Sequence, residues 1–242
     1  MIEIVQLGKD YGRFTAVSDL TLTVQPGEVL GLVGPNGAGK TTTFRCVAGV
    51  IPPSRGTVKI CGHSLALAAL EAKRQLAYFP DEPRLFDYLT VRQHLAFTAR
   101  IYGVEGYEAL GKGLLEELEL ANKVNELPGA LSRGMKQKLA IACGFLHNPK
   151  VMFFDEPLTG LDPGGIRRMK DSILRRAREG ATILISSHLL HLVEEICSHL
   201  LILKEGRAVA SGPIEEVRRR FAIEAPGATL EDVFFKATGT GG

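Results

Sequence analysis

A glycine-rich run that leads into a lysine and two threonines is the first feature of this sequence that is suited to chemistry. An apolar run at residues 29–33 precedes it. The run itself consists of Gly34, Pro35, Asn36, Gly37, Ala38, Gly39, Lys40, Thr41 and Thr42. It matches the phosphate-binding pattern G-x-x-x-x-G-K-[ST] between a strand and a helix, in which glycines let backbone N–H groups approach phosphate oxygens. We therefore expect Lys40 to contact the β- and γ-phosphates of a nucleotide, and Thr41 to offer its hydroxyl to Mg²⁺.

A second apolar run, residues 151–154, ends in the two carboxylates Asp155 and Glu156. Ligands bind at the carboxyl edge of open α/β sheets, so both side chains should face the bound phosphates. We expect Asp155 to hold Mg²⁺, directly or through water, and Glu156 to polarise the attacking water. A positioned general base contributes about 10² to 10⁴ in rate. The alternative is an acidic strand end that only aids solubility, which the phosphate-binding run disfavours.

The elements that must position these residues follow a simple order. Residues 2–7 and 20–24 alternate as strands around a turn at 9–12, and further strands are predicted at 56–60 and 76–79. Residues 90–147 have helical periodicity instead, with Thr90 and Ser132 as helix N-caps. Strands and helices alternate again from residue 151, and a hairpin is expected at 200–210. Short helices at 213–221 and 229–237 follow, with a frayed end at 238–242.

Composition sets limits on the partners. The chain has 242 residues, 45% of them hydrophobic, and a formal net charge of +2. This near-neutral balance gives no argument for a nucleic acid partner. No apolar run approaches the roughly 18 residues of a membrane span, and the first residues do not resemble a secretory signal, so any membrane role should be peripheral. The four cysteines are scattered without a CxxC pair and are expected to be reduced.

A third motif makes a family resemblance specific. Residues 131–137 read L-S-R-G-M-K-Q, about twenty positions before the second apolar run, and Asp162 and His188 follow that run. This order of motifs, from about residue 2 to 210, resembles the ATP-binding subunit of an ABC transporter. The resemblance implies an α/β fold: a P-loop NTPase core with a RecA-like mixed sheet, an N-terminal antiparallel β subdomain and an inserted α-helical subdomain. Residues 1–81 and 148–210 would form the core, 82–147 the inserted helices and 211–242 a helical extension.

The resemblance also implies an ATPase that uses ATP and Mg²⁺, with particular roles for single residues. Tyr11 matches the aromatic residue that stacks on adenine, although it also suits an ordinary turn. Ser132 and Gly134 match the signature that contacts the γ-phosphate held by a second ATP-binding subunit. His188 matches a histidine that contacts the γ-phosphate, and it joins Lys40 and Glu156 as the expected catalytic residues.

Two departures from the family pattern are visible. Arg133 and Met135 stand where the signature usually has glycine and glutamine. Asp81 stands where a glutamine that senses Mg²⁺ and the permease is usual. An aspartate can still reach Mg²⁺ or its water, so Asp81 is expected to be a metal ligand together with Thr41 and Asp155.

The sequence favours export over import. Residues 78–83, the signature variant and the tail L-E-D-V-F at 230–234 resemble bacterial subunits whose separate permeases export drugs, lipids or polysaccharides. We therefore expect a transmembrane permease and a second ATP-binding subunit as partners, at the cytoplasmic face of the membrane. The second subunit would be an identical copy or a paralogue. An ATPase of iron–sulfur cluster assembly, which also consists of a single ATP-binding domain, remains the non-transport alternative.

Overall fold

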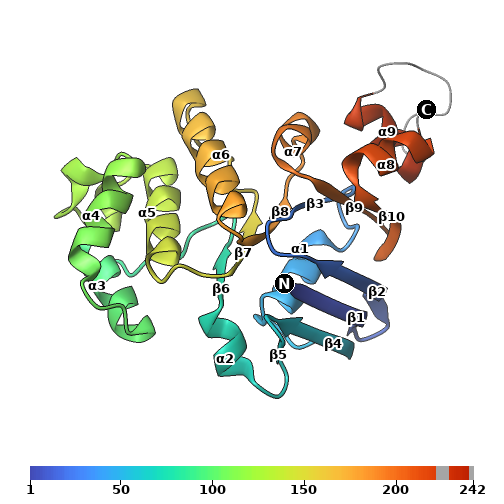
Figure 1. The fold of residues 1–242 in the computed structure, drawn as a ribbon, viewed down its shortest axis with the longest axis horizontal. Helices are drawn as coiled ribbons and strands as arrows, with labels where there is room; N and C mark the ends of the chain where they lie inside the picture. Colours follow the sequence, from blue (N-terminus) through green and yellow to red (C-terminus); the bar gives the residue numbers. More distant parts are fainter. Residues whose placement is uncertain (222–228, 240–242) are drawn as a thin grey trace.

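Two β-sheets lie on either side of helix α1 (Lys40–Val47) in the computed structural model, which describes residues 1–221 and 229–239 (Figure 1). The antiparallel sheet has the strand order β2-β1-β4-β5, and the central sheet has the order β10-β9-β3-β8-β7-β6. The antiparallel sheet consists of β1 (Ile2–Tyr11), β2 (Phe14–Val24), β4 (Arg55–Ile60) and β5 (His63–Ser64). The central sheet consists of β3 (Val29–Val33), β6 (Leu76–Phe79), β7 (Val151–Asp155), β8 (Thr182–Ser186), β9 (His199–Lys204) and β10 (Arg207–Pro213). All its neighbouring strands are parallel except β9 and β10.

Helices cover both faces of the central sheet, which explains why its inner strands are continuous apolar runs. Side chains alternate between the faces along β7: Val151 and Phe153 join the core around α1, whereas Met152 and Phe154 join the core on the opposite face. The remaining helices are α2 (Ala69–Arg74), α3 (Val91–Tyr102), α4 (Tyr107–Glu117), α5 (Arg133–Leu146), α6 (Pro163–Arg178), α7 (Leu190–Ile196), α8 (Ile214–Phe221) and α9 (Leu230–Thr238).

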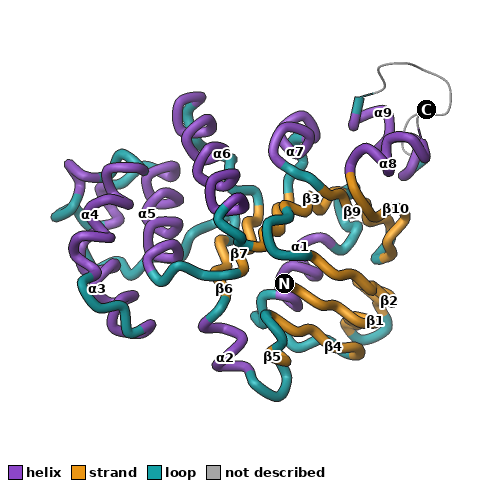
Figure 2. The backbone as a smooth tube through the Cα atoms, viewed as in Figure 1, coloured by secondary structure: helices purple, strands orange, loops and turns teal. Residues whose placement is uncertain are grey.

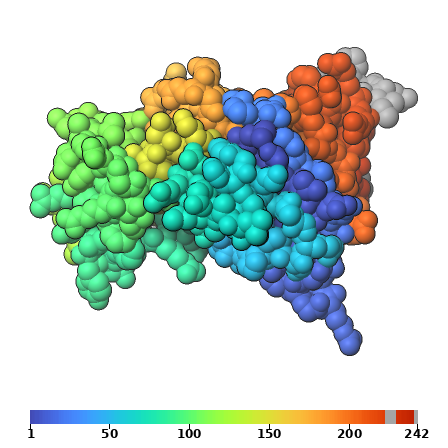
Figure 3. All heavy atoms as spheres, turned by 60° about the horizontal axis from the view of Figure 1, so that its bottom comes forward, coloured from blue at the N-terminus to red at the C-terminus, as the bar shows by residue number. Residues whose placement is uncertain are grey.

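Helices α3, α4 and α5 pack against one another and form a lobe at one end of the molecule, green in Figure 3. Thr90 caps α3 through a capping box, and Ser132 caps α5 by accepting a hydrogen bond from the Met135 N–H group. The loop of residues 80–90 leads from β6 to this lobe (Figure 2). Helices α8 and α9 lie at the other end, where they pack beside α7, β9 and β10.

The structure corrects some of the predicted boundaries. The turn expected at residues 9–12 is wrong, because β1 continues to Tyr11 and its pairing with β2 leaves only Gly12 and Arg13 in the turn. Helix α2 and strand β5 were not anticipated, because both are short. Thr238 is buried in α9 rather than frayed, and residues 240–242 lie outside the described part.

Cys46, Cys61, Cys143 and Cys197 are free thiols. None of the helices within residues 1–221 and 229–239 is long and apolar enough to span a membrane.

Candidate functional site

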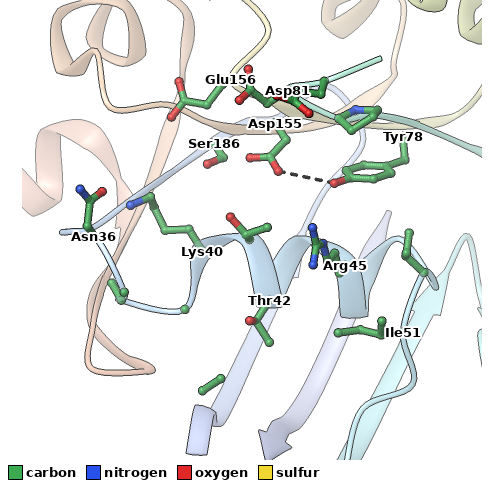
Figure 4. A pocket seen from close by; sticks show the side chains of 18 of the residues that line it. Asn36, Lys40, Thr42, Arg45, Ile51, Tyr78, Asp81, Asp155, Glu156 and Ser186 are labelled. Carbon is green, nitrogen blue, oxygen red and sulfur yellow. Dashed lines mark hydrogen bonds between the residues drawn. The ribbon is translucent and has the colours of Figure 1, made fainter. Parts of the chain in front are cut away.

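A cavity of about 1260 Å³ opens where the phosphate-binding run meets the carboxyl ends of β6, β7 and β8 (Figure 4). Asn36, Gly37, Ala38, Gly39, Lys40, Thr41 and Thr42 line it from the side of α1. Asp81, Asp155, Glu156, Ser186 and His188 line it from the other side. The cavity thus brings together residues that are spread over more than 150 positions of the sequence.

Backbone geometry explains the glycine at the start of α1. Gly39 is the N-cap residue of α1 with φ 99°, a left-handed conformation that favours glycine. A Cβ atom there would also lie 2.4 Å from the Ala16 carbonyl oxygen, so no other residue fits. The first turn of α1 therefore begins directly below the cavity, with its free N–H groups at the phosphate-binding run.

Lys40 folds back over the run that precedes it. Its Nζ atom donates to the carbonyl oxygens of Gly34 at 2.6 Å and Pro35 at 3.1 Å. Gly34 and Pro35 thus support the lysine, although neither is among the residues that line the cavity. Burial lowers the pKa of Lys40, and the charges of Glu156 and Asp155 oppose that shift.

Asp155 lies at the end of β7 with only 7% of its surface exposed. Burial raises its pKa; a hydrogen bond with Ser186 opposes the shift, and the charges of Glu156 and Asp81 add to it. The Tyr78 hydroxyl is 3.5 Å from Asp155 Oδ2. Figure 4 marks this hydrogen bond with a dashed line. Burial, with the Asp155 charge, raises the pKa of Tyr78 to about 12, so the hydroxyl stays protonated and donates to the carboxylate.

The oxygen donors of the cavity suit Mg²⁺. Thr41, Asp155 and Asp81 line the same space, and they supply a hydroxyl and carboxylate oxygens. No group of three or more His, Cys, Asp or Glu side chains converges as a metal site within the described ranges. Mg²⁺ is usually bound by one or two carboxylates together with substrate phosphates and water, and Asp155 and Asp81 are carboxylates of this kind.

Glu156 is held at the cavity by two partners on the segment after β8. Its Oε2 atom is 2.9 Å from His188 Nδ1 and accepts a hydrogen bond from the Ser187 hydroxyl at 3.3 Å. The contact follows from the sheet, because β7 and β8 are parallel neighbours with Asp155 opposite Ser186. Glu156 adopts φ 52°, a left-handed conformation that is strained for a non-glycine residue.

The signature residues lie outside the cavity of their own chain. Neither Ser132 nor Gly134 lines it, and both stand at the start of α5. A Cβ atom on Gly134 would lie 2.8 Å from the Gly160 carbonyl oxygen, so glycine allows α5 to approach the loop between β7 and α6. Asp162, in that loop, is the N-cap residue of α6.

Tyr11 and Phe14 form a directly paired set at the tip of the β1–β2 hairpin. Phe14 lines the cavity, whereas Tyr11 is not among its lining residues. The Lys9 Nζ atom lies 5.3 Å from the centre of the Tyr11 ring. The sequence interpretation missed Phe14, and its position opposite Tyr11 across a two-residue turn was the available signal.

Arg45 and Tyr78 also line the cavity and were not anticipated. Arg45 is four positions after Thr41 on α1, a spacing that places the two side chains on the same face of the helix. Tyr78 alternates with Phe79 along β6, and its position on the cavity side becomes evident only from the sheet order.

Comparisons with known proteins show the family to which this chain belongs. The family model described as ABC transporter matches residues 17–159. The chain is 33% identical over 240 residues to the ABC-type transporter ATP-binding protein EcsA of Bacillus subtilis, covering 98% of this chain and 96% of that one. It is 36% identical over 221 residues to the bacitracin transport ATP-binding protein BcrA of Bacillus licheniformis, covering 91% and 72%.

A solved structure described as the ATP binding subunit of an ABC transporter has the same fold. It superimposes with a TM-score of 0.93 at 36% sequence identity, covering 98% of this chain and 99% of that one. The chain therefore belongs to the ABC transporter family, in which it is an ATP-binding ATPase subunit.

Proposed function

We propose that this chain binds ATP with Mg²⁺ in the cavity beside α1 and hydrolyses it to power a separate membrane permease. The observation that carries the proposal is the meeting of the phosphate-binding run with Asp155, Glu156 and His188 around one cavity. A glycine-rich helix start binds the phosphates, and the carboxylates face them from the neighbouring strand ends.

Each residue has a separate task in the proposed reaction. Lys40 contacts the β- and γ-phosphates, and Glu156 orients and polarises the attacking water. His188 contacts the γ-phosphate while its Nδ1 atom stays with Glu156. Mg²⁺, held by Thr41, Asp155 and Asp81, would neutralise the charge that builds up on the phosphates.

The active form is proposed to be a dimer of ATP-binding subunits. Ser132 and Gly134 lie outside the cavity of their own chain, so they are free to close the cavity of a second subunit. Ser132 and the N–H groups at the start of α5 provide an anion site for the γ-phosphate. This contact favours the closed dimer, and hydrolysis removes it. An identical copy suffices as partner, because one chain carries both halves of the site.

Export is the direction that we propose, through a permease bound at the cytoplasmic face of the membrane. The names of relatives support transport, since BcrA is a bacitracin transport protein. The permease would contact the loop of residues 80–90 and the helical lobe, which we propose as the inserted subdomain of residues 82–147. Phe86 and Tyr88 in that loop are 54% and 91% exposed, which suits a protein partner.

The proposal is tested first on the purified chain. Lys40→Ala should abolish ATP hydrolysis, whereas Lys150→Ala, which changes an exposed lysine outside the cavity, should not. Turnover near that of the unmodified chain in Lys40→Ala would contradict the phosphate-binding assignment.

The transport role is tested in membranes. The tagged chain should co-purify with a polytopic membrane protein, and the permease should change its ATPase rate. Co-purification with soluble iron–sulfur assembly proteins instead would favour the non-transport alternative.

A further inference from the structure

Arg133 at the start of α5 and Asp81 after β6 form an ion pair that connects two functional segments. The NH2 group of Arg133 donates to Asp81 Oδ1 over 2.9 Å, although 52 positions separate the two residues. Asp81 lines the cavity, whereas Arg133 follows Ser132 directly and lies outside it. The pair therefore joins the nucleotide cavity to the signature that is presented to a second subunit.

Because both side chains of this ion pair are exposed, the pair can open at little cost. The side chains of Arg133 and Asp81 are 55% and 45% exposed. Water screens ion pairs of this kind, so they contribute little to stability. The Arg133 guanidinium can therefore leave Asp81 for another anion without a large cost to the fold.

Two other contacts keep α5 beside the cavity when the pair opens. The buried Gln137 donates from Nε2 to the Pro80 carbonyl oxygen at 3.4 Å. The aliphatic part of Arg133 lies against Gly160, since a Cβ atom there would be 3.5 Å from Arg133 Cδ. The main chain of α5 thus stays in place while the charged end of Arg133 is free to move.

We propose that Arg133 is a phosphate-binding residue that Asp81 holds back in the empty subunit and releases when the cavity is filled. The proposal rests on the proposed function, because it needs Asp81 to turn toward ATP-bound Mg²⁺ and the signature to face a second subunit. Once Asp81 turns to that cation, Arg133 is left beside Ser132 with an unpaired guanidinium.

A free guanidinium in this place is suited to the γ-phosphate of the partner's nucleotide. Its planar N–H groups bind phosphate by two parallel hydrogen bonds, and Arg133 is directly next to the Ser132 anion site. Filling one cavity therefore prepares the same chain to bind the nucleotide of the other. The two sites are thereby coupled, because Arg133 leaves Asp81 in its own chain and binds the phosphate in the other.

The test measures the formation of the dimer and not ATP turnover. All proteins carry Glu156→Gln, and the dimer is measured by analytical ultracentrifugation with saturating ATP. Samples contain either Mg²⁺ or EDTA. The variants are Asp81→Ala, Arg133→Ala, the double variant and Arg133→Lys. Lys112→Ala, which removes an exposed ion pair with Glu116 in the same lobe, is the matched control.

The decisive result is expected in EDTA. Asp81→Ala frees Arg133 without the cation, so ATP-driven dimerisation should strengthen about tenfold or more, the order expected for one charge-assisted contact at each site. The double variant should lack this gain, because the gain depends on Arg133. With Mg²⁺, Arg133→Ala should weaken the dimer by a similar factor, Arg133→Lys should restore part of it, and Lys112→Ala should match the parent.

Three results would overturn the proposal. The first is that Asp81→Ala does not strengthen ATP-driven dimerisation in EDTA, or that the double variant dimerises just as strongly. Either outcome would mean that Asp81 does not hold Arg133 back. The second is that Arg133→Ala dimerises as strongly as the parent with Mg²⁺, which would exclude a contact between Arg133 and the phosphate. If the Glu156→Gln parent itself fails to dimerise with Mg²⁺ and ATP, the proposed composite site is wrong as well, so the two failures are distinguishable.

Discussion

Glu156 Oε2 lies 2.9 Å from His188 Nδ1, so two residues that are 32 positions apart share one hydrogen bond at the edge of the cavity. The bond holds the Glu156 carboxylate through Nδ1 of His188, so Nε2 is the ring nitrogen that would make the proposed contact with the γ-phosphate. Glu156→Gln should lower kcat by about 10² to 10⁴, because it would remove the proposed general base while keeping the shape of the side chain.

Two measurements check this prediction. ATP-dependent dimerisation of Glu156→Gln should persist, since binding does not need the base, and the exposed Glu179→Gln should hydrolyse ATP normally. A Glu156→Gln variant with undiminished turnover would remove Glu156 from the role of base.

The aromatic pair at the hairpin tip, Tyr11 and Phe14, leads to a prediction about how the adenine ring of ATP is bound. Phe14 lines the cavity and Tyr11 is paired with it, so we expect Phe14→Ala to weaken ATP binding at least as much as Tyr11→Ala. Stacking of a base on an aromatic ring is worth about 1 to 3 kcal/mol, so the Kd should rise about fivefold or more. Equilibrium titration with ATP measures this, and Phe14→Tyr should bind normally. A loss confined to Tyr11→Ala would place the adenine on Tyr11 alone.

Glu117 on α4 predicts the pH dependence of the contact between the helical lobe and α6. Its Oε1 atom accepts hydrogen bonds from the Ser172 hydroxyl at 2.6 Å and from Arg175 at 2.8 Å. Burial opposes ionisation, but these bonds and the charge of Arg176 outweigh it and hold the pKa of Glu117 below its usual 4.5. The stabilisation is therefore present above pH 4.5 and is lost as the pH falls through the lower pKa of the folded state.

Urea unfolding of Glu117→Gln at several pH values checks this. The variant should lose about 1.5 to 3 kcal/mol at pH 7, the range for hydrogen bonds to a charged group. The difference from the unmodified chain should shrink as the pH falls below 4.5. Glu116→Gln, on the exposed side of α4, is the control, and a pH-independent loss in Glu117→Gln would contradict the role of the charge.

The buried carboxylate of Asp155 is expected to lower the stability of the ligand-free subunit while it serves the binding of Mg²⁺ with ATP. Burial, with the charges of Glu156 and Asp81, raises its pKa, so the ionised carboxylate destabilises the empty subunit at neutral pH. Asp155→Asn should therefore raise the free energy of unfolding without ligand. The gain should shrink as the pH falls below the raised pKa and vanish below the usual 3.8, where Asp155 is protonated in both the folded and the unfolded chain. Thermal unfolding should also show that Mg²⁺ with ATP no longer stabilises the variant beyond ATP alone. A destabilised empty Asp155→Asn subunit would contradict this explanation.

Local patterns were sufficient to predict much of the fold and of the site. The strand of residues 76–79 and the caps at Thr90 and Ser132 agree with the structure, because alternation and capping chemistry act between near neighbours in the chain. The short α2 and the exact turn after β1 were missed, because a helix of six residues or a hairpin tip is too short for a period to show.

The sequence by itself determined the chemistry of the phosphate-binding run, the carboxylates after β7 and the order of the motifs. Only the tertiary structure decided which of these residues meet. The sheet order brought Glu156 to His188, the hairpin brought Phe14 to the cavity, and α5 brought Arg133 to Asp81. Such contacts depend on the packing of whole elements, and a spacing of 52 positions has no local period that would reveal them.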